Sequence, residues 1–217
     1  TVADDITFTI EADGTVAVDK ETVADKTIVM RDAKTTVVVS KKAIIGNDEL
    51  PGATLQILDE NRTVVNINEN ESLEWLTTTT ANVIEGLKTG VTYILHEVSA
   101  PDGYTVAEDI TFTIEVDGTV KVGETVANDN IVEMKDMPIV TVSGTKTWNV
   151  PERTTLPESI TVNLYRNGSK IESKKVTAKD EWKYSWSELP VYSSDGMSKY
   201  TYTVDEEPIA GYNKTID

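Results

Sequence analysis

Three ionisable side chains lie at the ends of predicted strands, each on the same face as the apolar residues before it. The residue pattern therefore predicts that they point into the protein. Lys41 ends the apolar face of VVVSK, Glu97 that of VTYILHE and Asp136 that of VEMKD. Because successive side chains of a strand point to opposite faces, each charged residue shares the inward face of its apolar neighbours. The sequence therefore predicts an amine and two carboxyls inside one fold.

These side-chain types could form an amide bond with one another. Burial disfavours charge, so it favours a neutral amine on Lys41 and a protonated carboxyl on Asp136. A neutral amine is a nucleophile, and a protonated carboxyl is an acyl electrophile. Glu97 could hydrogen-bond the Asp136 carbonyl, carry the proton and assist the loss of water. Near-fixed geometry would supply a high effective molarity, so this hypothesis requires no separate enzyme.

Two other interpretations of the three charges remain open. The strands could end at these residues, which would place the charges at a solvated rim of the fold. Alternatively, the side chains could form a buried ion triad, which is costly and rarely adds stability. The coincidence of a Lys, a Glu and an Asp at equivalent strand positions favours the chemical interpretation over the rim.

Strands must position these groups, and apolar residues alternate with polar ones through much of the chain. The alternation is clearest at residues 110–116, 160–164 and 200–204. Gly-containing turns separate such segments at Asp13-Gly14, Asp117-Gly118, Asn167-Gly168 and Asp195-Gly196. No convincing amphipathic helix is present. The predicted fold class is all-β, with tandem immunoglobulin-like β-sandwich modules.

An internal repeat defines the expected domains. The segment TVADDITFTIEADGTVAV at the start of the chain recurs from residue 105 as TVAEDITFTIEVDGTVKV. A repeat spacing near domain size predicts tandem modules. We expect residues 1–34 to be the C-terminal half of a preceding module and residues 35–138 to be a complete module. Residues 139–217 are expected to form a third module that lacks its last strand.

Composition excludes several kinds of site and partner. A net charge of −17 argues against nucleic acid, because phosphate binding needs basic patches. One His and no Cys rule out a thiolate zinc site, a disulfide framework and a Cys nucleophile. No apolar run is long enough to span a membrane, and we predict no metal and no cofactor. Outside the cell, such a chain would need a covalent staple other than a disulfide.

The complete module resembles a known family in the motifs VVSKK, LPGATLQI, EVSAPDGY and IVEMKD. These are similar to the prealbumin-like (SpaA-type) and collagen-adhesin B-type domains of Gram-positive surface proteins and pili, which are known for spontaneous intramolecular isopeptide bonds. The resemblance implies that Lys41 is the nucleophile, Asp136 its partner and Glu97 the catalytic acid. Many relatives have Asn in place of Asp136, and Asp would release water rather than ammonia.

The third module resembles the collagen-adhesin B-type branch in VSGTKTW, PESITVNLYRNG, WKYSWSELP and KYTYTVDEEPIAGY. By that resemblance Lys146 is a nucleophile and Glu206 a catalytic acid, with the reactive partner in a strand beyond Asp217. In the first copy of the repeat, Asp32 aligns with Asp136. We expect Asp32 to be an acceptor whose Lys lies upstream of residue 1.

The predicted function is structural: a stalk module of a bacterial surface adhesin or pilus, with no catalysis beyond one self-directed turnover. Its expected partners are neighbouring modules of the same polypeptide and, through another domain, a host extracellular matrix protein. The expected location is extracellular, on the cell wall, with the anchor outside this chain. The alternative is a module that binds a host protein or glycan, which an exposed aromatic patch would favour. Packing is expected for the candidate residues Trp148, Trp182 and Trp186.

Overall fold

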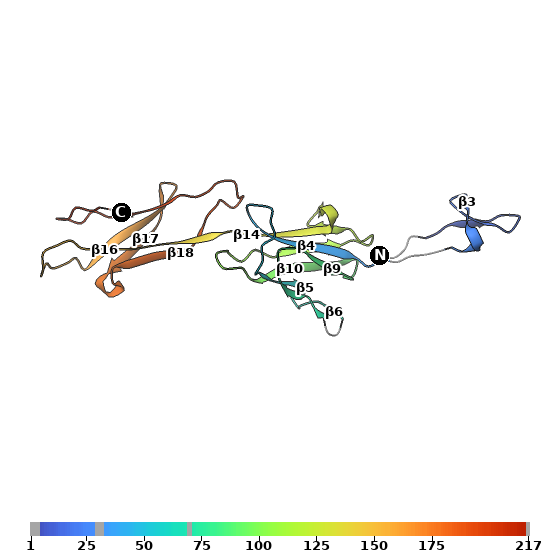
Figure 1. Ribbon diagram of the computed structural model, residues 1–217, viewed down its shortest axis with the longest axis horizontal. Coiled ribbons are helices and arrows are strands. Elements are labelled where there is room, and N and C mark those ends of the chain that lie inside the picture. The colour runs from blue at the N-terminus through green and yellow to red at the C-terminus, as the bar shows by residue number, and fades with distance from the viewer. Residues whose placement is uncertain (1–4, 29–32, 69–70, 216–217) are drawn as a thin grey trace.

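The computed structural model describes residues 5–28, 33–68 and 71–215, and strands dominate this part of the chain (Figure 1). The helical pieces among these residues are short 3₁₀ turns. The first segment contains β1 (Phe8–Ile10), β2 (Val16–Val18), β3 (Glu21–Thr22) and η1 (Ala24–Lys26).

The middle segment begins and ends with strands that lie side by side. It contains β4 (Thr36–Ala43), β5 (Thr54–Leu58), β6 (Asn66–Asn68), β7 (Glu71–Ser72), β8 (Glu74–Leu76), β9 (Asn82–Glu85), β10 (Val91–Ser99), β11 (Ile110–Ile114), β12 (Val120–Val122), β13 (Thr125–Val126), η2 (Asn128–Asn130) and β14 (Ile131–Asp136). Strands β4 and β14 pair in parallel, whereas the other strand pairs in the described residues are antiparallel.

Two sheets of the middle segment enclose one apolar core. Their strand orders are β13-β12-β11-β10-β5-β8 and β14-β4-β9. Both sheets contribute alternate residues to the core, among them Val37, Leu55, Leu95, Phe112 and Val132. Because one face of each sheet is apolar, burying both faces against each other gives a β-sandwich. The predicted all-β sandwich fold is confirmed.

The third segment forms a second pair of sheets. It contains β15 (Ile139–Thr145), β16 (Ser159–Arg166), β17 (Ser169–Thr177), η3 (Ala178–Asp180), β18 (Lys183–Pro190) and β19 (Tyr202–Glu206), in the orders β15-β18 and β17-β16-β19. The β16–β17 hairpin turns at Asn167 and Gly168, both at positive φ as a two-residue turn requires. Its core includes Ile160, Leu164 and Trp186.

Val140 and Val142 of β15 share strand parity, yet Val140 is the more exposed of the two. Val140 is 40% exposed. The register shifts between the pairs Val140–Leu189 and Val142–Trp186, so β18 carries one residue more than β15 there. Glu188, at φ 56°, lies in this bulge. The bulged residues of β18 thus interrupt its regular pairing with β15 next to the position opposite Val140.

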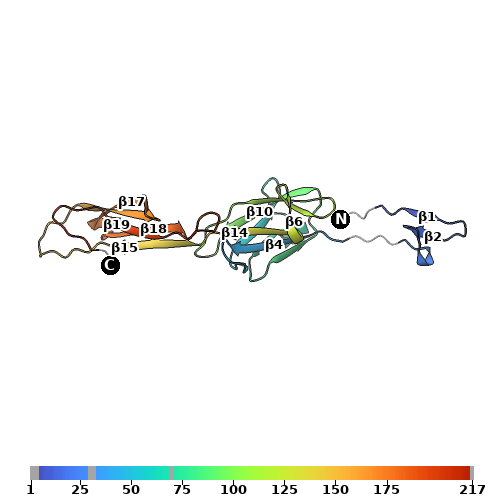
Figure 2. The ribbon, with the colours of Figure 1, turned by 90° about the horizontal axis from the view of Figure 1, so that it is seen from above.

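Strands β14 and β15 follow each other almost in line, so the middle and third segments lie end to end (Figures 1 and 2). Between the two strands stand only Met137 and Pro138. Backbone bonds fix this passage on both sides: Ile139 N donates to Gly103 O at 2.8 Å, and Val191 N donates to Pro138 O at 2.9 Å.

The repeat in the sequence recurs as a repeat of elements. The order β1, β2, β3, η1 matches β11, β12, β13, η2. Burial differs between the copies, because Phe8 and Ile10 are 49% and 69% exposed, whereas Phe112 and Ile114 are 1% and 0% exposed. The same apolar alternation thus forms strands in both places. Among the described residues, a second sheet covers it in the middle segment and not in the first.

Candidate functional site

Strand alternation brings Lys41, Glu97 and Asp136 together inside the middle sandwich. Lys41 comes from β4, Glu97 from β10 and Asp136 from β14, and their exposed fractions are 1%, 1% and 0%. The apolar patterns of these strands therefore continue inward to their charged residues. A solvated rim is excluded as the location of these three side chains.

The parallel pairing of β4 with β14 sets the distance between Lys41 and Asp136. Lys41 pairs with Met134, so Asp136 lies two residues further along β14 on the same face. The Lys41 ammonium donates a hydrogen bond to Asp136 Oδ1 and forms an ion pair with it. The second carboxyl oxygen, Asp136 Oδ2, is buried without a hydrogen-bond partner among the described residues.

Glu97 reaches the pair from the opposite sheet. Its Oε1 lies 2.9 Å from Lys41 Nζ, and its Oε2 accepts a hydrogen bond from Ala107 N at 2.6 Å. One carboxyl oxygen is thereby held by the backbone, while the other contacts the amine. No sequence pattern indicates the Ala107 contact, because Ala107 lies in a loop without periodicity.

The electrostatics make the Asp136 carboxyl easier to protonate than an exposed one. Burial raises the pKa of Asp136 to about 6; the Glu97 carboxylate also raises it, while Lys41 lowers it. Burying two carboxyls beside one ammonium leaves a net negative charge in the core, which desolvation makes costly. Conversion of the amine and the Asp136 carboxyl into a neutral amide would remove two of these charges.

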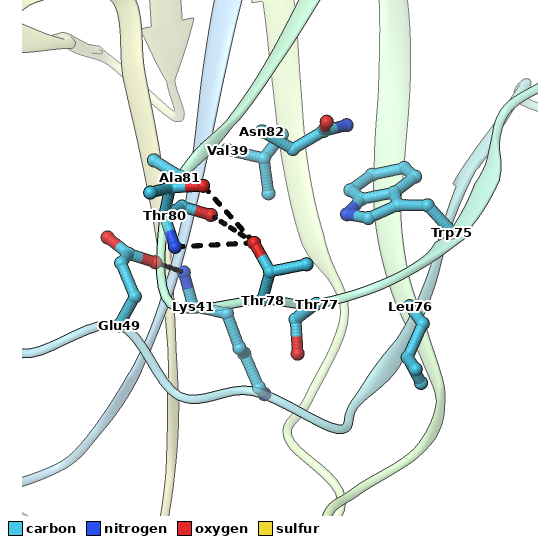
Figure 3. A pocket seen from close by; sticks show the side chains of 10 residues that line it. All are labelled: Val39, Lys41, Glu49, Trp75, Leu76, Thr77, Thr78, Thr80, Ala81 and Asn82. Carbon is cyan, nitrogen blue, oxygen red and sulfur yellow. Dashed lines mark hydrogen bonds between the residues drawn. The ribbon is translucent and has the colours of Figure 1, made fainter.

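A small cavity lies beside the Lys41 backbone (Figure 3). It has a volume of about 60 Å³ and is bordered by the loop between β8 and β9. Across it from this loop, Glu49 Oε2 accepts a hydrogen bond from Lys41 N at 2.8 Å. No periodicity marks Glu49, so this contact cannot be predicted from the sequence pattern.

The third segment holds a similar pair with weaker burial. Lys146 Nζ lies 3.0 Å from Glu206 Oε2, and the two side chains are 16% and 12% exposed. Lys146 also stacks over the Trp148 ring, 4.8 Å from its centroid. In the described residues, Glu206 is the acidic partner of this lysine. The predicted acceptor Asp32 lies outside the described residues.

The tryptophans of the third segment pack in or against its core. Trp186 is 3% exposed, and the Trp148 and Trp182 rings meet edge to face at 5.2 Å. Both rings also contact the core of the segment. All three rings therefore take part in packing, and Trp148 and Trp182 remain partly exposed.

No metal or membrane element is found in the part of the chain that the structure describes. It contains no group of three His, Cys, Asp or Glu side chains that could hold a metal ion. Within the same residues, no helix has the length and apolarity needed to cross a bilayer.

Family models match the middle and the third segments. Residues 35–130 match the SpaA prealbumin-like fold domain, and residues 142–217 match the Cna protein B-type domain. A collagen adhesin of Staphylococcus aureus is 32% identical over 173 residues, which cover 73% of this chain and 13% of that protein. The chain thus spans a small part of this curated relative.

Solved structures with related sequences are also found. A pilus-presented adhesin is 33% identical, with a TM-score of 0.35, over 45% of this chain and 21% of its own. Two B repeat units of the collagen-binding protein of Staphylococcus aureus match 100% of this chain and 53% of theirs, at 17% identity and a TM-score of 0.37.

Proposed function

The chain carries a SpaA-type prealbumin-like domain followed by a Cna B-type domain, and from this premise we propose that it is a structural stalk segment of a Gram-positive surface adhesin or pilus. The prealbumin-like module is stapled by a self-formed amide between Lys41 and Asp136. Beyond this single turnover the chain is not an enzyme. Its stalk would project a binding domain, located elsewhere in the parent, toward a host matrix protein.

The observation that carries the proposal is the contact between the Lys41 amine and the Asp136 carboxyl inside the core, with Glu97 beside both. Proton transfer within the ion pair gives a neutral amine and a carboxylic acid. Nζ attacks Cγ of Asp136, the new C–N bond forms, and Glu97 takes the proton from nitrogen. Glu97 returns this proton to the departing hydroxyl, so one water leaves and Glu97 ends unchanged.

The amide would join the first and last strands of the module. In the chain-entropy account developed for disulfides, closing a loop of roughly 100 residues adds about 4.7 kcal/mol of stability before strain. Pulling force would pass from β4 to β14 through a covalent bond instead of through backbone hydrogen bonds. An amide also survives reduction, which suits a surface protein whose sequence contains no Cys.

The test is the intact mass of the purified, denatured chain beside a Lys41→Ala variant. We expect the wild-type mass to lie one water below the value calculated from its sequence, and the variant to show its full calculated mass. Peptide mapping should place the missing water at Lys41 and Asp136. A full wild-type mass would contradict the proposal and leave the three residues as a buried ion triad.

The same measurement addresses the other two reactive positions. We infer that Lys146 keeps a free amine, because its acidic contact among the described residues is Glu206, which stands in the position of the proton carrier. Asp32 should keep a free carboxyl, because Lys41 is already paired with Asp136. The expected loss is therefore one water and no more. A second lost water, mapped to Lys146 or Asp32, would contradict this part of the proposal.

A further inference from the structure

The backbone of Lys41 lacks a neighbouring strand on one side. On the other side β14 pairs with β4 from Val38 to Ala43. Strand β9 pairs with β4 only from Thr36 to Val39. Beyond Val39, no strand among the described residues pairs with the β9 side of β4. The structure has only an isolated antiparallel bridge there, between Lys42 and Glu49.

Glu49 and its neighbour fill this place. Glu49 Oε2 accepts from Lys41 N at 2.8 Å, and Leu50 N donates to Lys41 O at 2.6 Å. The other oxygen, Glu49 Oε1, accepts from the hydroxyl of Ser40 at 2.6 Å. One carboxylate thus bonds two successive residues of β4 and replaces the missing strand partner.

The small cavity leaves room for the Lys41 backbone to move if its hydrogen bond to Glu49 is lost. It lies between Lys41 and the β8–β9 loop, with Glu49 at its edge (Figure 3). Empty space beside a strand lets the backbone relax toward it when a restraint is lost. A shift of the Lys41 backbone would carry Nζ away from the Asp136 carboxyl.

We propose that Glu49 is a positioning residue for amide formation. It fixes the Lys41 backbone on the side that β9 leaves open, and so keeps Nζ against the Asp136 carboxyl. The inference rests on the proposed function, because it concerns the rate of that reaction. Displacements of about 1 Å can slow a positioned reaction by roughly 100-fold.

The test compares the rate of cross-linking in Glu49→Ala, Glu49→Gln and Asp48→Ala. Each chain is made by cell-free synthesis, samples are quenched in denaturant at intervals, and intact mass gives the cross-linked fraction. We expect Glu49→Ala to react roughly 10- to 100-fold more slowly than wild type. Glu49→Gln should recover most of the rate, because its amide can still accept from Lys41 N and bond Ser40. Asp48→Ala removes a neighbouring exposed charge and should react at the wild-type rate.

A measurement of folding shows whether a slow reaction comes from a displaced Lys41 or from a less stable chain. The unreactive Lys41→Ala chain and its Glu49→Ala double variant are compared by urea unfolding, and both should be fully folded without urea. A slow reaction in a folded chain then reflects geometry. A Glu49→Ala chain that reacts at the wild-type rate, or a Glu49→Gln chain as slow as Glu49→Ala, overturns the inference alone. A wild-type chain that never loses water overturns the proposed function, and the inference with it.

Discussion

At the scale of single residues, the protonation of Asp136 decides when the site can react. Its pKa is raised to about 6, first by burial. The reactive pair, a neutral amine and a carboxylic acid, holds the same number of protons as the ion pair. The ratio of reactive pair to ion pair is therefore independent of pH. The reactive fraction stays constant as long as most sites hold this number of protons. Below the raised pKa a further proton gives an ammonium beside a carboxylic acid, which cannot react.

This proton count predicts the pH dependence of cross-linking. We expect a constant rate from pH 7 to 8 and a decline below about pH 6, approaching tenfold per pH unit. Unreacted chain, collected in denaturant during synthesis, would be refolded into buffers from pH 5 to 8 and followed by intact mass. A rate that rises steadily as the pH falls from 8 to 5 would contradict the assignment.

Alternation in the sequence was sufficient to place the three charged side chains in the core, because a period of two fixes the face of every strand residue. It could not reveal Glu49 or the backbone amide of Ala107. Both act from segments outside the regular strands, where no period relates sequence to direction, although each lies close in sequence to the residue that it holds. Local pattern predicts the reacting groups, and tertiary structure supplies the groups that hold them.

At the scale of elements, the parallel pair β4 and β14 is secured where β14 begins. Asn130 Nδ2 donates to Thr36 O at 3.1 Å and to Gly118 O at 3.3 Å. Its Oδ1 accepts from Val120 N at 3.1 Å. One side chain therefore links the start of β14 to β4 and to the turn before β12. Alternation carries no information on pairing direction, so the parallel register was not predictable from it.

Asn130→Ala should weaken this link without touching the reactive groups. We expect a loss of roughly 2–4 kcal/mol, from three hydrogen bonds and the strain of Ala at φ 56°. Urea unfolding in the uncross-linked Lys41→Ala background measures it. Asp129→Ala is the matched control, since Asp129 also has a positive φ, of 52°, and its side chain bonds only within the turn. Equal losses in the two variants would contradict the role of the Asn130 side chain.

At the scale of the whole molecule, contacts as well as chain connectivity join the middle and third modules. Besides the backbone bonds around Pro138, Gly196 lies against Ile44 of the middle module. A Cβ added at Gly196 would be 3.0 Å from Ile44 O and 3.2 Å from Ile44 Cγ1. The approach requires a residue without a side chain, so we expect the contact between the loop after β18 and Ile44 to limit bending at the junction.

Gly196→Val should loosen this junction. The chain has no Cys, so spin labels can be placed at Asp102→Cys and Lys170→Cys, two exposed sites in different modules. Pulsed electron resonance should give a broader or shifted distance distribution for Gly196→Val than for the unsubstituted glycine. Gly211→Val is the control, because Gly211 also has positive φ, but a Cβ there meets no atom within 4 Å. Identical distributions for all three chains would refute the role of Gly196.

The parallel placement of β4 and β14 has a topological consequence once the amide has formed. Residues 41–136 become a closed ring, and the rest of the chain leaves it as two tails, one from each end of the new bond. A protease that cuts the ring at any exposed turn between these residues opens or shortens it. It does not separate the tails, however many such cuts are made, because the amide still joins them. Covalent continuity across the module would then no longer depend on the integrity of the polypeptide between Lys41 and Asp136.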